Sequence, residues 1–588
     1  MAWGQGSPVD YRISLAKRHD HLLHVDIHLA GTSAEREVQL PAWNALYQIR
    51  DFAQYVRRVT AKDYSGAELP VRKVDKTTWR ISHAESGAEV EYDILADQPG
   101  PYGAQLNDEH AFLNLAQVLM YPMDSRDSLM TVTFSDLPGD WDVATVLPPL
   151  NPGDPPRLGR FSARNYDRLV DAPVEMGKFA YTVVEEGGAR YAIAVHADPT
   201  DYDLKALREI VRKTVVSEVA WMNDRPFGDF LFIYHFPRHP GGGGMEHAYS
   251  TAIDVPADRL HDDPLELASV TAHEFFHLWN VKRIRPRSLE PIDYLRENFT
   301  TSLWFCEGFT NTVADYTLLR TGMLNEQQFL TSLSRDIYRL ESRPAVRRQS
   351  VEESSLDTWF DKYPQYRTPE RSIDYYNKGE ILGILLDLAM RDRTRGTRSL
   401  RDLFQFMQKN YFYEARYFDD TAGIRDSVQK VTGQDFGWFF NNYVSGVAPI
   451  PYDDFFRGVG LRLEHRRTVL PDAGFVSAKN FDQPPAVYVV TPGSDAERAG
   501  LLAGDTILAI NGRPASSDVE TAISAMAPGD TVKLKINGRR GPREIKIKLG
   551  GREQDDYAIV ELPAVTPAQR ARRAAWLRGE AEAAGGTP

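Results

Sequence analysis

Residues 273–277 read His273-Glu274-Phe275-Phe276-His277. Apolar residues recur around this stretch at helical spacing, so the sequence predicts a helix over residues 265–279. A step of four residues on a helix puts both imidazoles on one face, about one turn apart. The stretch therefore predicts a helix that presents two ring nitrogens in one direction.

Two histidines in this pattern are typical of a Zn²⁺ site. A catalytic zinc ion needs a third protein ligand and an open position for water, whose pKa it lowers towards neutrality. Glu274 is rotated by about 100° from His273 on the helix, and we expect it to take the proton of that water as general base. The alternative is a helix that holds two histidines by chance, which we expect in roughly one chain in fifty of this composition.

A second acidic residue lies in a second predicted helix, over residues 302–319. Glu307 stands among large apolar side chains in the run from Leu303 to Thr310. A buried carboxylate without a partner is unfavourable, so a cation should lie beside it. Glu307 is therefore the predicted third ligand. Asn311 follows one turn later and is a candidate to hydrogen-bond a ligand histidine, with a surface amide as the alternative.

Length and composition limit which classes of protein this chain can belong to. The 588 residues favour three to five domains, and a hydrophobic content of 42% can fill their cores. The 69 basic and 82 acidic residues leave a formal charge of −13, which disfavours nucleic acid as the main partner. A single cysteine, Cys306, cannot form an internal disulfide.

Apolar runs also bound the expected compartment. No run approaches the ~20 apolar residues of a membrane-spanning helix. Residues 1–30 alternate polar with apolar residues and show no export signal. The sequence as it stands predicts a cytoplasmic protein, and a trimmed sequence of a periplasmic protein is the alternative.

The run from His273 to Asn280 and the run from Leu303 to Thr310 together resemble the gluzincin metallopeptidases, and are most similar to the bacterial glycyl aminopeptidase family. The resemblance implies a multidomain α+β protein with an N-terminal antiparallel β domain, a thermolysin-like and mostly α catalytic domain with a helical extension, and a C-terminal PDZ domain. Pattern shifts along the chain suggest these boundaries: β domain 1–165, zinc peptidase domain 166–325, helical part 326–448, PDZ domain 453–551, and C-terminal tail 552–588. The last residues are expected to form either a partial helix or a mobile tail.

The run from Gly241 to His247 resembles the exopeptidase motif of zinc aminopeptidases, with His247 where those enzymes usually have Asn. A glycine-rich edge lets a peptide backbone lie close to the protein. The resemblance implies a substrate site at Gly244, Met245 and Glu246, where Glu246 holds the α-ammonium group. A flexible loop with a solvated Glu246 is the alternative. His235, His239 and His247 fit no zinc template as well as the first set, so we interpret them as loop or strand residues.

Residues 375–379, Tyr375-Tyr376-Asn377-Lys378-Gly379, resemble an element of the same aminopeptidases in which a tyrosine donates a hydrogen bond to the tetrahedral oxyanion. By register this residue is Tyr376, with Tyr375 as the alternative. There is also a departure from the family pattern. Residues 40–53 resemble a signature of the N-terminal domain, but Asn44-Ala45 stands where Pro-Gly is expected.

Residues 486–512 contain the order Ala-Gly-Leu, Gly-Asp-x-Ile, Ile-Asn-Gly, which is similar to bacterial PDZ domains. Such domains add a partner's C-terminal strand to a sheet edge and hold its carboxylate with backbone N–H groups. We expect the carboxylate loop at Gly458, Val459, Gly460 and Leu461. The alternative is a PDZ domain that braces the catalytic domain and binds nothing.

Together these features predict an aminopeptidase with one Zn²⁺ per chain that acts on peptides with a free N-terminus. The resemblance implies small N-terminal residues, Gly and then Ala. One alternative is an endopeptidase in which Glu246 merely lines the cleft. Another is a PDZ scaffold with an inert catalytic half.

Overall fold

The computed structural model describes residues 9–44, 47–239, 241–480, 483–515 and 519–580. Two compact units are present: residues 1–462 together with 561–588 form the first, and residues 463–560 form the second. The protein has the mixed α/β, multidomain architecture that the sequence predicts. Within the described ranges, no helix combines the length and the apolar character needed to cross a membrane.

The N-terminal part of the first unit consists of three sheets around one core. The largest has the order β14-β12-β1-β2-β8-β4-β5, and the others run β13-β15-β10-β9 and β11-β3-β7-β6. Alternation decides which side chains enter the core: Tyr11, Ile13 and Leu15 are buried, and the residues between them face outward or are partly buried. One pair, β1 with β12, is parallel, which corrects the expectation of a purely antiparallel domain.

The strands of these sheets are β1 (Val9–Lys17), β2 (Leu22–Ala30), β3 (Glu35–Gln39), β4 (Val56–Lys62), β5 (Glu68–Leu69), β6 (Val71–Lys73), β7 (Thr78–Ser82), β8 (Gly87–Leu95), β9 (Ala104–Leu106), β10 (His110–Leu113), β11 (Tyr121–Pro122), β12 (Met130–Ser135), β13 (Asp142–Ala144), β14 (Arg160–Ala163) and β15 (Val174–Gly177). Two short helices, α1 (Leu115–Val118) and α2 (Tyr166–Val170), connect them.

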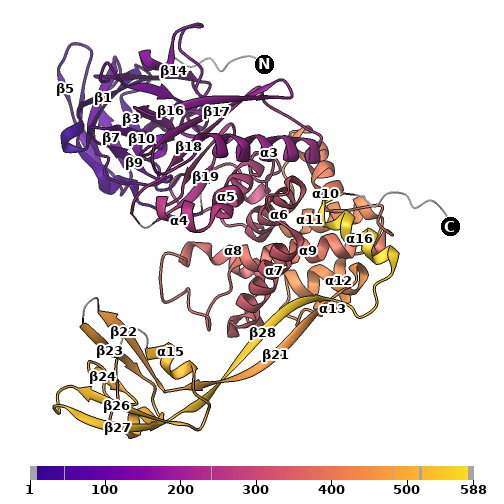
Figure 1. Ribbon diagram of the computed structural model, residues 1–588. Helices are drawn as coiled ribbons and strands as arrows, with labels where there is room; N and C mark the ends of the chain where they lie inside the picture. Colours follow the sequence, from indigo (N-terminus) through magenta and orange to yellow (C-terminus); the bar gives the residue numbers. More distant parts are fainter. Residues whose placement is uncertain (1–8, 45–46, 240, 481–482, 516–518, 581–588) are drawn as a thin grey trace. The chain divides into compact units, whose positions relative to one another are not determined.

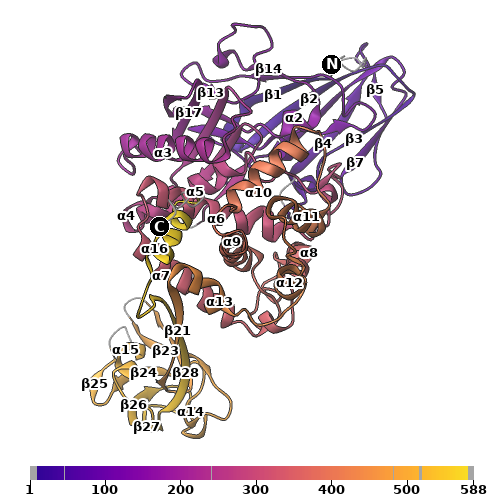
Figure 2. The same ribbon diagram turned by 90° about the vertical axis from the view of Figure 1, so that its right-hand side faces the viewer.

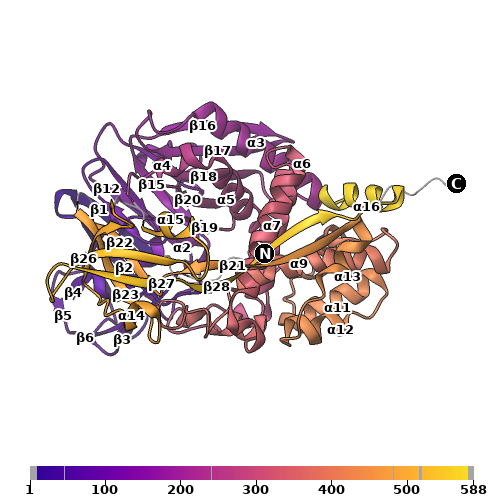
Figure 3. The same cartoon turned by 60° about the horizontal axis from the view of Figure 1, so that its bottom comes forward.

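A five-stranded mixed sheet follows, with the order β16-β17-β18-β20-β19. Its strands are β16 (Ala180–Glu186), β17 (Ala189–His196), β18 (Asp229–His235), β19 (Gly243–Glu246) and β20 (Ser250–Asp254). Helices α3 (Leu204–Met222) and α5 (Pro264–Phe276) pack against each other and on this sheet (Figures 1 and 3). A short helix, α4 (Ala257–Asp262), connects β20 to α5. Among the described strands, the edge strand β19 pairs with β20 alone, and it also contacts α5.

The rest of the first unit is helical, and α9 (Tyr375–Arg393) lies at its centre (Figure 2). Asp374 caps α9 by accepting the backbone N–H of Tyr376 at 2.9 Å. A π-helical turn, η5 (Trp304–Gly308), leads directly into α6. The remaining helices are α6 (Phe309–Thr321), α7 (Glu326–Glu341), α8 (Val351–Leu356), α10 (Leu400–Met407), α11 (Asp420–Thr432), α12 (Gly437–Phe439) and α13 (Tyr452–Phe456).

Two glycines bring η5 and α9 into close contact. A Cβ atom on Gly308 would collide with the backbone of Gly379, and one on Gly379 would collide with the carbonyl oxygen of Trp304. Neither position has a left-handed backbone, so lack of space, and not backbone conformation, requires glycine at both. This contact places the turn that carries Glu307 beside the N-terminal end of α9.

The described residues after the second unit, 561–580, pack on the first unit. Helix α16 (Pro567–Leu577) packs on α6, and the fully buried Trp576 donates its indole N–H to the Tyr316 hydroxyl oxygen at 2.8 Å. Trp221 donates its indole N–H to the Gly579 carbonyl oxygen at 2.8 Å. The structure therefore groups residues 561–580 with the first unit, whereas the sequence predicts a separate tail from residue 552.

The second unit contains a sheet with the order β22-β23-β24-β26-β27, in which β25 also pairs with β24. Its elements are β22 (Phe475–Asn480), β23 (Gln483–Val490), α14 (Asp495–Arg498), β24 (Thr506–Ile510), β25 (Arg513–Pro514), α15 (Val519–Ser524), β26 (Thr531–Asn537) and β27 (Arg543–Lys548). Strands β21 (Leu461–Asp472) and β28 (Gly550–Glu561) form a two-stranded sheet. An aliphatic core that includes Ile507, Leu534 and Ile547 holds the unit together.

The predicted carboxylate loop spans a short turn and the start of a strand. Gly458 and Val459 lie in the short turn η10 (Arg457–Val459), Gly460 ends it at φ 75°, and Leu461 begins β21. All four belong to the first unit, where a Cβ atom on Gly460 would lie 2.6 Å from Val565. They directly precede the second unit in the chain, and their role as a carboxylate loop stays a prediction.

The glycine contact can be tested by Gly308→Ala. The added methyl group has no room against the Gly379 backbone, so we expect the free energy of unfolding to fall by about 1–3 kcal/mol or more. Urea denaturation measures this change. Gly228→Ala is the matched control, because a Cβ atom there has open space around it. Equal denaturation midpoints for the two variants would show that η5 and α9 are not in close contact.

Candidate metal centre

The structure brings the three predicted metal ligands together inside the first unit. His273 lies in α5, His277 directly follows its last residue, and Glu307 comes from η5. Glu307 Oε2 is 3.4 Å from His273 Nε2 and 3.3 Å from His277 Nε2, and the two Nε2 atoms are 2.9 Å apart. All three residues are buried. Three donor atoms thus surround one point that a single ion can occupy.

The hydrogen bonds of the two rings show which ring nitrogens direct a lone pair at this shared point. His273 Nδ1 donates to Asn311 Oδ1 at 2.7 Å, and His277 Nδ1 donates to the Asn280 carbonyl oxygen at 2.6 Å. In a neutral ring a proton on Nδ1 leaves a lone pair on Nε2. Two nitrogen lone pairs and a carboxylate oxygen then repel one another unless a cation lies among them. Two imidazoles and a carboxylate are a donor set that Zn²⁺ accepts, with a position left for water.

Electrostatics point the same way. Burial would lower the pKa of His277, but the carboxylates of Glu307 and Glu246 raise it to about 10. Burial would raise the pKa of Glu307, but His277 and His273 bring it well below its usual range. The carboxylates therefore favour a positive charge beside the histidine nitrogens, which either a proton or a metal ion can supply.

The glycine-rich strand β19 lies beside this centre. Donor atoms of Glu246, Glu274 and His277 lie within 4.8 Å of one another. Glu246 is only 5% exposed and lines the cavity over the centre, and no side chain among the described residues donates a hydrogen bond to its carboxylate. Gly244 has no room for a side chain, because a Cβ atom there would overlap the Glu274 carboxylate. A close approach between β19 and α5 thus explains this glycine.

Glu274 occupies an environment suited to holding a proton. Its Oε2 atom is buried and has no hydrogen-bond partner among the described residues. Burial and the neighbouring carboxylates of Glu246 and Glu307 raise its pKa well above the ordinary value, against the opposing effect of His277. Met245, in contrast, packs into the N-terminal part, where its sulfur accepts the Asn114 side-chain N–H at 3.0 Å.

A cavity of about 280 Å³ opens over the centre. Both candidate tyrosines line it, but only one has a free hydroxyl group. The Tyr375 hydroxyl shares a hydrogen bond with Thr358 at 3.1 Å and its side chain is buried, whereas Tyr376 is 37% exposed and its hydroxyl has no partner within the described part of the chain. The Tyr376 ring lies 6.3 Å from the His273 ring, centroid to centroid.

The cavity also has walls that sequence patterns did not reveal. The N-terminal part contributes Tyr47, Arg50 and Tyr102, and the loop before α9 contributes Asp361 and Arg367. The Arg50 guanidinium lies 4.4 Å from the centre of the Tyr102 ring. Tyr47 and Arg50 lie in the run of residues 40–53 that resembles the N-terminal signature, whereas Tyr102, Asp361 and Arg367 belong to no motif identified in the sequence. All five come from segments far from α5 in the chain.

Further hydrogen bonds fix residues that contact the centre or line its cavity. Glu380 Oε2 accepts the Asn311 side-chain N–H at 3.1 Å, so Asn311 is held between Glu380 and the ligand His273. Asn44, which stands where Pro was expected, donates to the Tyr102 carbonyl oxygen at 3.0 Å.

His247 is buried and its Nδ1 lies 3.2 Å from Asp171 Oδ1, so it is held away from the three-ligand group.

Comparison with known families covers three parts of the chain. Residues 10–178 match the Peptidase M61 N-terminal domain, residues 266–382 match the M61 glycyl aminopeptidase, and residues 487–537 match a PDZ domain. Among curated proteins, the periplasmic pH-dependent serine endoprotease DegQ of Escherichia coli is 35% identical over 81 residues, which is 13% of this chain and 18% of that protein. The chain thus spans about a fifth of the length of the curated relatives it matches.

Among solved structures, an aminopeptidase N family protein from Idiomarina loihiensis superposes with a TM-score of 0.84 at 24% identity, over 97% of this chain and 100% of that one. This likeness establishes a shared fold. An M1 zinc metallopeptidase from Deinococcus radiodurans has a TM-score of 0.46 at 12% identity, over 76% of this chain and 95% of that one.

The support given by Asn311 can be tested directly. Asn311→Ala removes the acceptor that fixes the His273 ring, so we expect zinc affinity to fall about 10-fold to 100-fold without loss of the fold. Competition with a chromophoric chelator measures the affinity. Asn441→Ala, at an exposed amide, should leave it unchanged. Equal affinities for both variants would mean that Asn311 does not orient the ring.

Proposed function

The chain belongs to the M61 family of glycyl aminopeptidases, and on this premise we propose that it is a zinc-dependent aminopeptidase that removes a small residue from the N-terminus of peptides. One observation carries the proposal beyond the family. The buried carboxylate of Glu246, without a hydrogen bond from the described residues, lies beside a His, His, Glu donor set. A buried carboxylate needs a cation, and the α-ammonium group of a peptide is one that binds and leaves.

His273, His277 and Glu307 are the residues that hold the metal in this proposal. When bound there, Zn²⁺ supplies a Lewis acid that polarises the scissile carbonyl and lowers the pKa of water. The three ligands carry a single negative charge, so the centre keeps a net positive charge towards the substrate. Asn311 and the Asn280 carbonyl keep both rings in the tautomer that presents Nε2.

Glu274 moves the proton. It follows His273 in the helix and faces the same space as Glu246, so it can take a proton from the attacking water and deliver it to the leaving amine. Its raised pKa makes it a better base than an ordinary carboxylate, and burial keeps bulk water from competing for the proton.

Glu246 and β19 set where the peptide is cut. The outer edge of β19 is not paired within the described sheet, so a peptide backbone can lie along it. With the ammonium group against Glu246, the first peptide bond would lie on the side of Glu274 and His277, whose donor atoms are within 4.8 Å of those of Glu246. An endopeptidase would leave Glu246 buried beside Glu274 and Glu307 without any cation of its own, which disfavours that alternative.

Tyr376 completes the site in this proposal by donating its free hydroxyl hydrogen to the oxyanion. Partial removal from water inside the cavity and the Glu307 charge raise the pKa of Tyr376 well above the ordinary value, so the phenol remains a donor at neutral pH. Preference for Gly and then Ala comes from the family resemblance. The cavity volume of about 280 Å³ and the rings of Tyr47 and Tyr102 in its wall agree with a small first residue.

For the second unit we propose binding of a C-terminal peptide at a sheet edge, the usual mode of PDZ domains. The described order leaves β22 and β27 as edges of the sheet. A peptide library with free C-termini, compared with the amidated peptides, tests this by fluorescence anisotropy. Equal or absent binding of both sets would favour a bracing role.

The ammonium contact is tested by Glu246→Gln. Loss of the charge should lower kcat/KM for glycine p-nitroanilide about 100-fold or more, because the ammonium group loses its buried partner. Glu185→Gln, at an exposed position on β16, is the matched control. The N-acetylated substrate should be inert towards the wild type. Efficient cleavage of that blocked substrate would support the endopeptidase alternative.

The proton-transfer step is tested by Glu274→Gln, which keeps the size of the side chain. We expect kcat to fall about 10²-fold to 10⁴-fold while zinc content stays the same. Unchanged turnover would refute the proposed mechanism.

The two tyrosines are separated by Tyr376→Phe and Tyr375→Phe. Loss of the Tyr376 hydroxyl should lower kcat about 100-fold or more. The Tyr375 hydroxyl is hydrogen-bonded to Thr358, so its loss should lower kcat much less. A larger effect at Tyr375 would reverse the assignment.

A further inference from the structure

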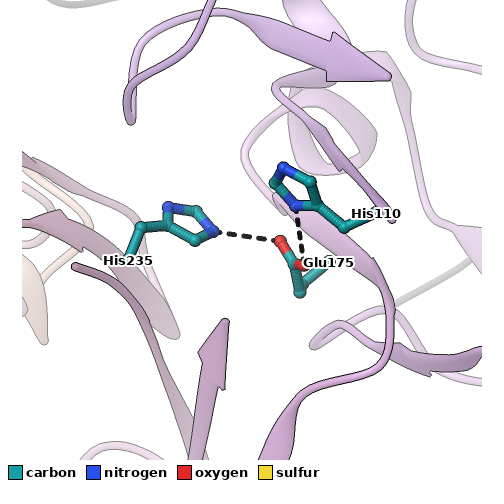
Figure 4. A group of neighbouring side chains, drawn as sticks. All are labelled: His110, Glu175 and His235. Atoms are coloured by element: carbon teal, nitrogen blue, oxygen red, sulfur yellow. Dashed lines mark hydrogen bonds and ion pairs between the residues drawn. The ribbon is translucent and has the colours of Figure 1, made fainter. Parts of the chain in front are cut away.

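A second histidine and carboxylate cluster lies in the first unit and shares no residue with the centre described above. It consists of His110 at the start of β10, Glu175 in β15 and His235 at the end of β18 (Figure 4). His110 Nδ1 is 3.2 Å from Glu175 Oε1, and His235 Nε2 is 3.1 Å from Glu175 Oε2. All three side chains are at least nine-tenths buried, and their donor atoms lie within 4.8 Å of one another.

The far nitrogen of each ring has its own acceptor. His110 Nε2 lies 3.2 Å from Gln105 Oε1, and His235 Nδ1 lies 2.9 Å from Asp254 Oδ1. A proton held on the far nitrogen leaves the near one with a lone pair directed at Glu175. This repeats the pattern of His273 and His277, whose far nitrogens donate to Asn311 and to a carbonyl oxygen. A carboxylate behind a histidine, as Asp254 is here, is the usual support of a metal ligand.

We propose that His110, Glu175 and His235 form a second metal site, which takes a divalent transition-metal ion such as Zn²⁺. Two imidazole nitrogens and one carboxylate oxygen suit Zn²⁺, Co²⁺ or Ni²⁺ better than Ca²⁺ or Mg²⁺, which take mostly oxygen ligands. A cavity of about 240 Å³ reaches the cluster and is lined by His110, His235 and Asp254. An ion can therefore enter, and water can complete its coordination.

The alternative is that protons alone hold the cluster together. A protonated His235 between Asp254 and Glu175 would make a buried ion triad, and these carboxylates raise the pKa of His235 to about 10 against the effect of burial. His110 argues for the metal. Its ring is fixed by stacking on His196, with the centroids 3.8 Å apart and the planes 7° from parallel. In this orientation Nδ1 faces Glu175 and the ring borders the cavity, so an ion can bind there without movement of the ring. One divalent ion neutralises Glu175 and leaves every ring neutral.

The location suggests what the ion does. His110 and Glu175 come from the N-terminal four-stranded sheet, and His235 comes from the five-stranded sheet that supports the zinc helix. Glu175 is 65 residues from His110 and 60 from His235 in the sequence. An ion held by all three links the two sheets, and it stabilises the native state because the unfolded chain does not assemble the ligands.

Metal content after removal by a chelator, reloading with Zn²⁺ and gel filtration tests the proposal. The wild type should retain two zinc ions per chain. His235→Ala and Glu175→Gln should each retain one, as should His273→Ala, and the double variant His235→Ala with His273→Ala should retain none. His196→Ala is the matched control, because this ring stacks on His110 without contributing a ligand, and it should retain two. Retention of one ion by the wild type and by Glu175→Gln alike would overturn the proposal.

A second measurement does not depend on the first centre. In the His273→Ala, His277→Ala background, Zn²⁺ should raise the melting temperature, and Co²⁺ should give the visible absorption of a low-symmetry nitrogen and oxygen site. Adding Glu175→Gln to this background should abolish both effects. Because neither readout uses catalysis, failure of the aminopeptidase proposal would leave this result intact. Absence of both effects in the parent background would show that protons, and not a metal, hold the cluster.

Discussion

Two imidazole nitrogens and one carboxylate oxygen face one another in the interior of the protein, and they can stay there only with positive charge among them. His273, His277 and Glu307 are buried, and their near atoms lie 2.9 to 3.4 Å apart. Bringing such groups together without a cation costs the desolvation of each and their mutual repulsion. The surrounding structure is arranged to hold them at these distances.

At two places, glycine residues allow the close packing that this arrangement needs, because they have no side chain. Gly308 and Gly379 let the π-helical turn of Glu307 lie against the start of α9, which carries Tyr376. Gly244 lets the edge strand β19 lie against Glu274, which brings Glu246 to the same cavity. The first contact brings Glu307 near Tyr376, and the second brings Glu274 near Glu246. The glycines therefore serve the site through close contact, and neither Gly308 nor Gly244 has a left-handed backbone.

The three glutamates around the centre lie in different electrostatic environments. Glu307 is kept ionised by the histidines, whereas burial and its acidic neighbours make Glu274 hold a proton more readily. Glu246 is buried without a hydrogen bond from the described residues. These environments fit a metal ligand, a proton carrier and a cation receptor respectively. The cluster of His110, Glu175 and His235 uses the first of these solutions again, with Asp254 as the supporting acceptor.

Local patterns in the sequence determined much of this protein. Helical periodicity predicted the helix of His273 and His277, and a lone acid among apolar residues pointed to Glu307, because spacing along one element controls which side chains share a face. Only the tertiary structure decided what distant segments do together. It engaged the Tyr375 hydroxyl and left that of Tyr376 without a partner among the described residues. It also brought Tyr47 and Tyr102 to the cavity and placed Gly458 to Leu461 outside the second unit. It also joined His235 to residues 60 and 125 positions away, where spacing alone suggested a plain strand residue. Contacts of this kind depend on how sheets and helices pack, and no short stretch of sequence contains that information.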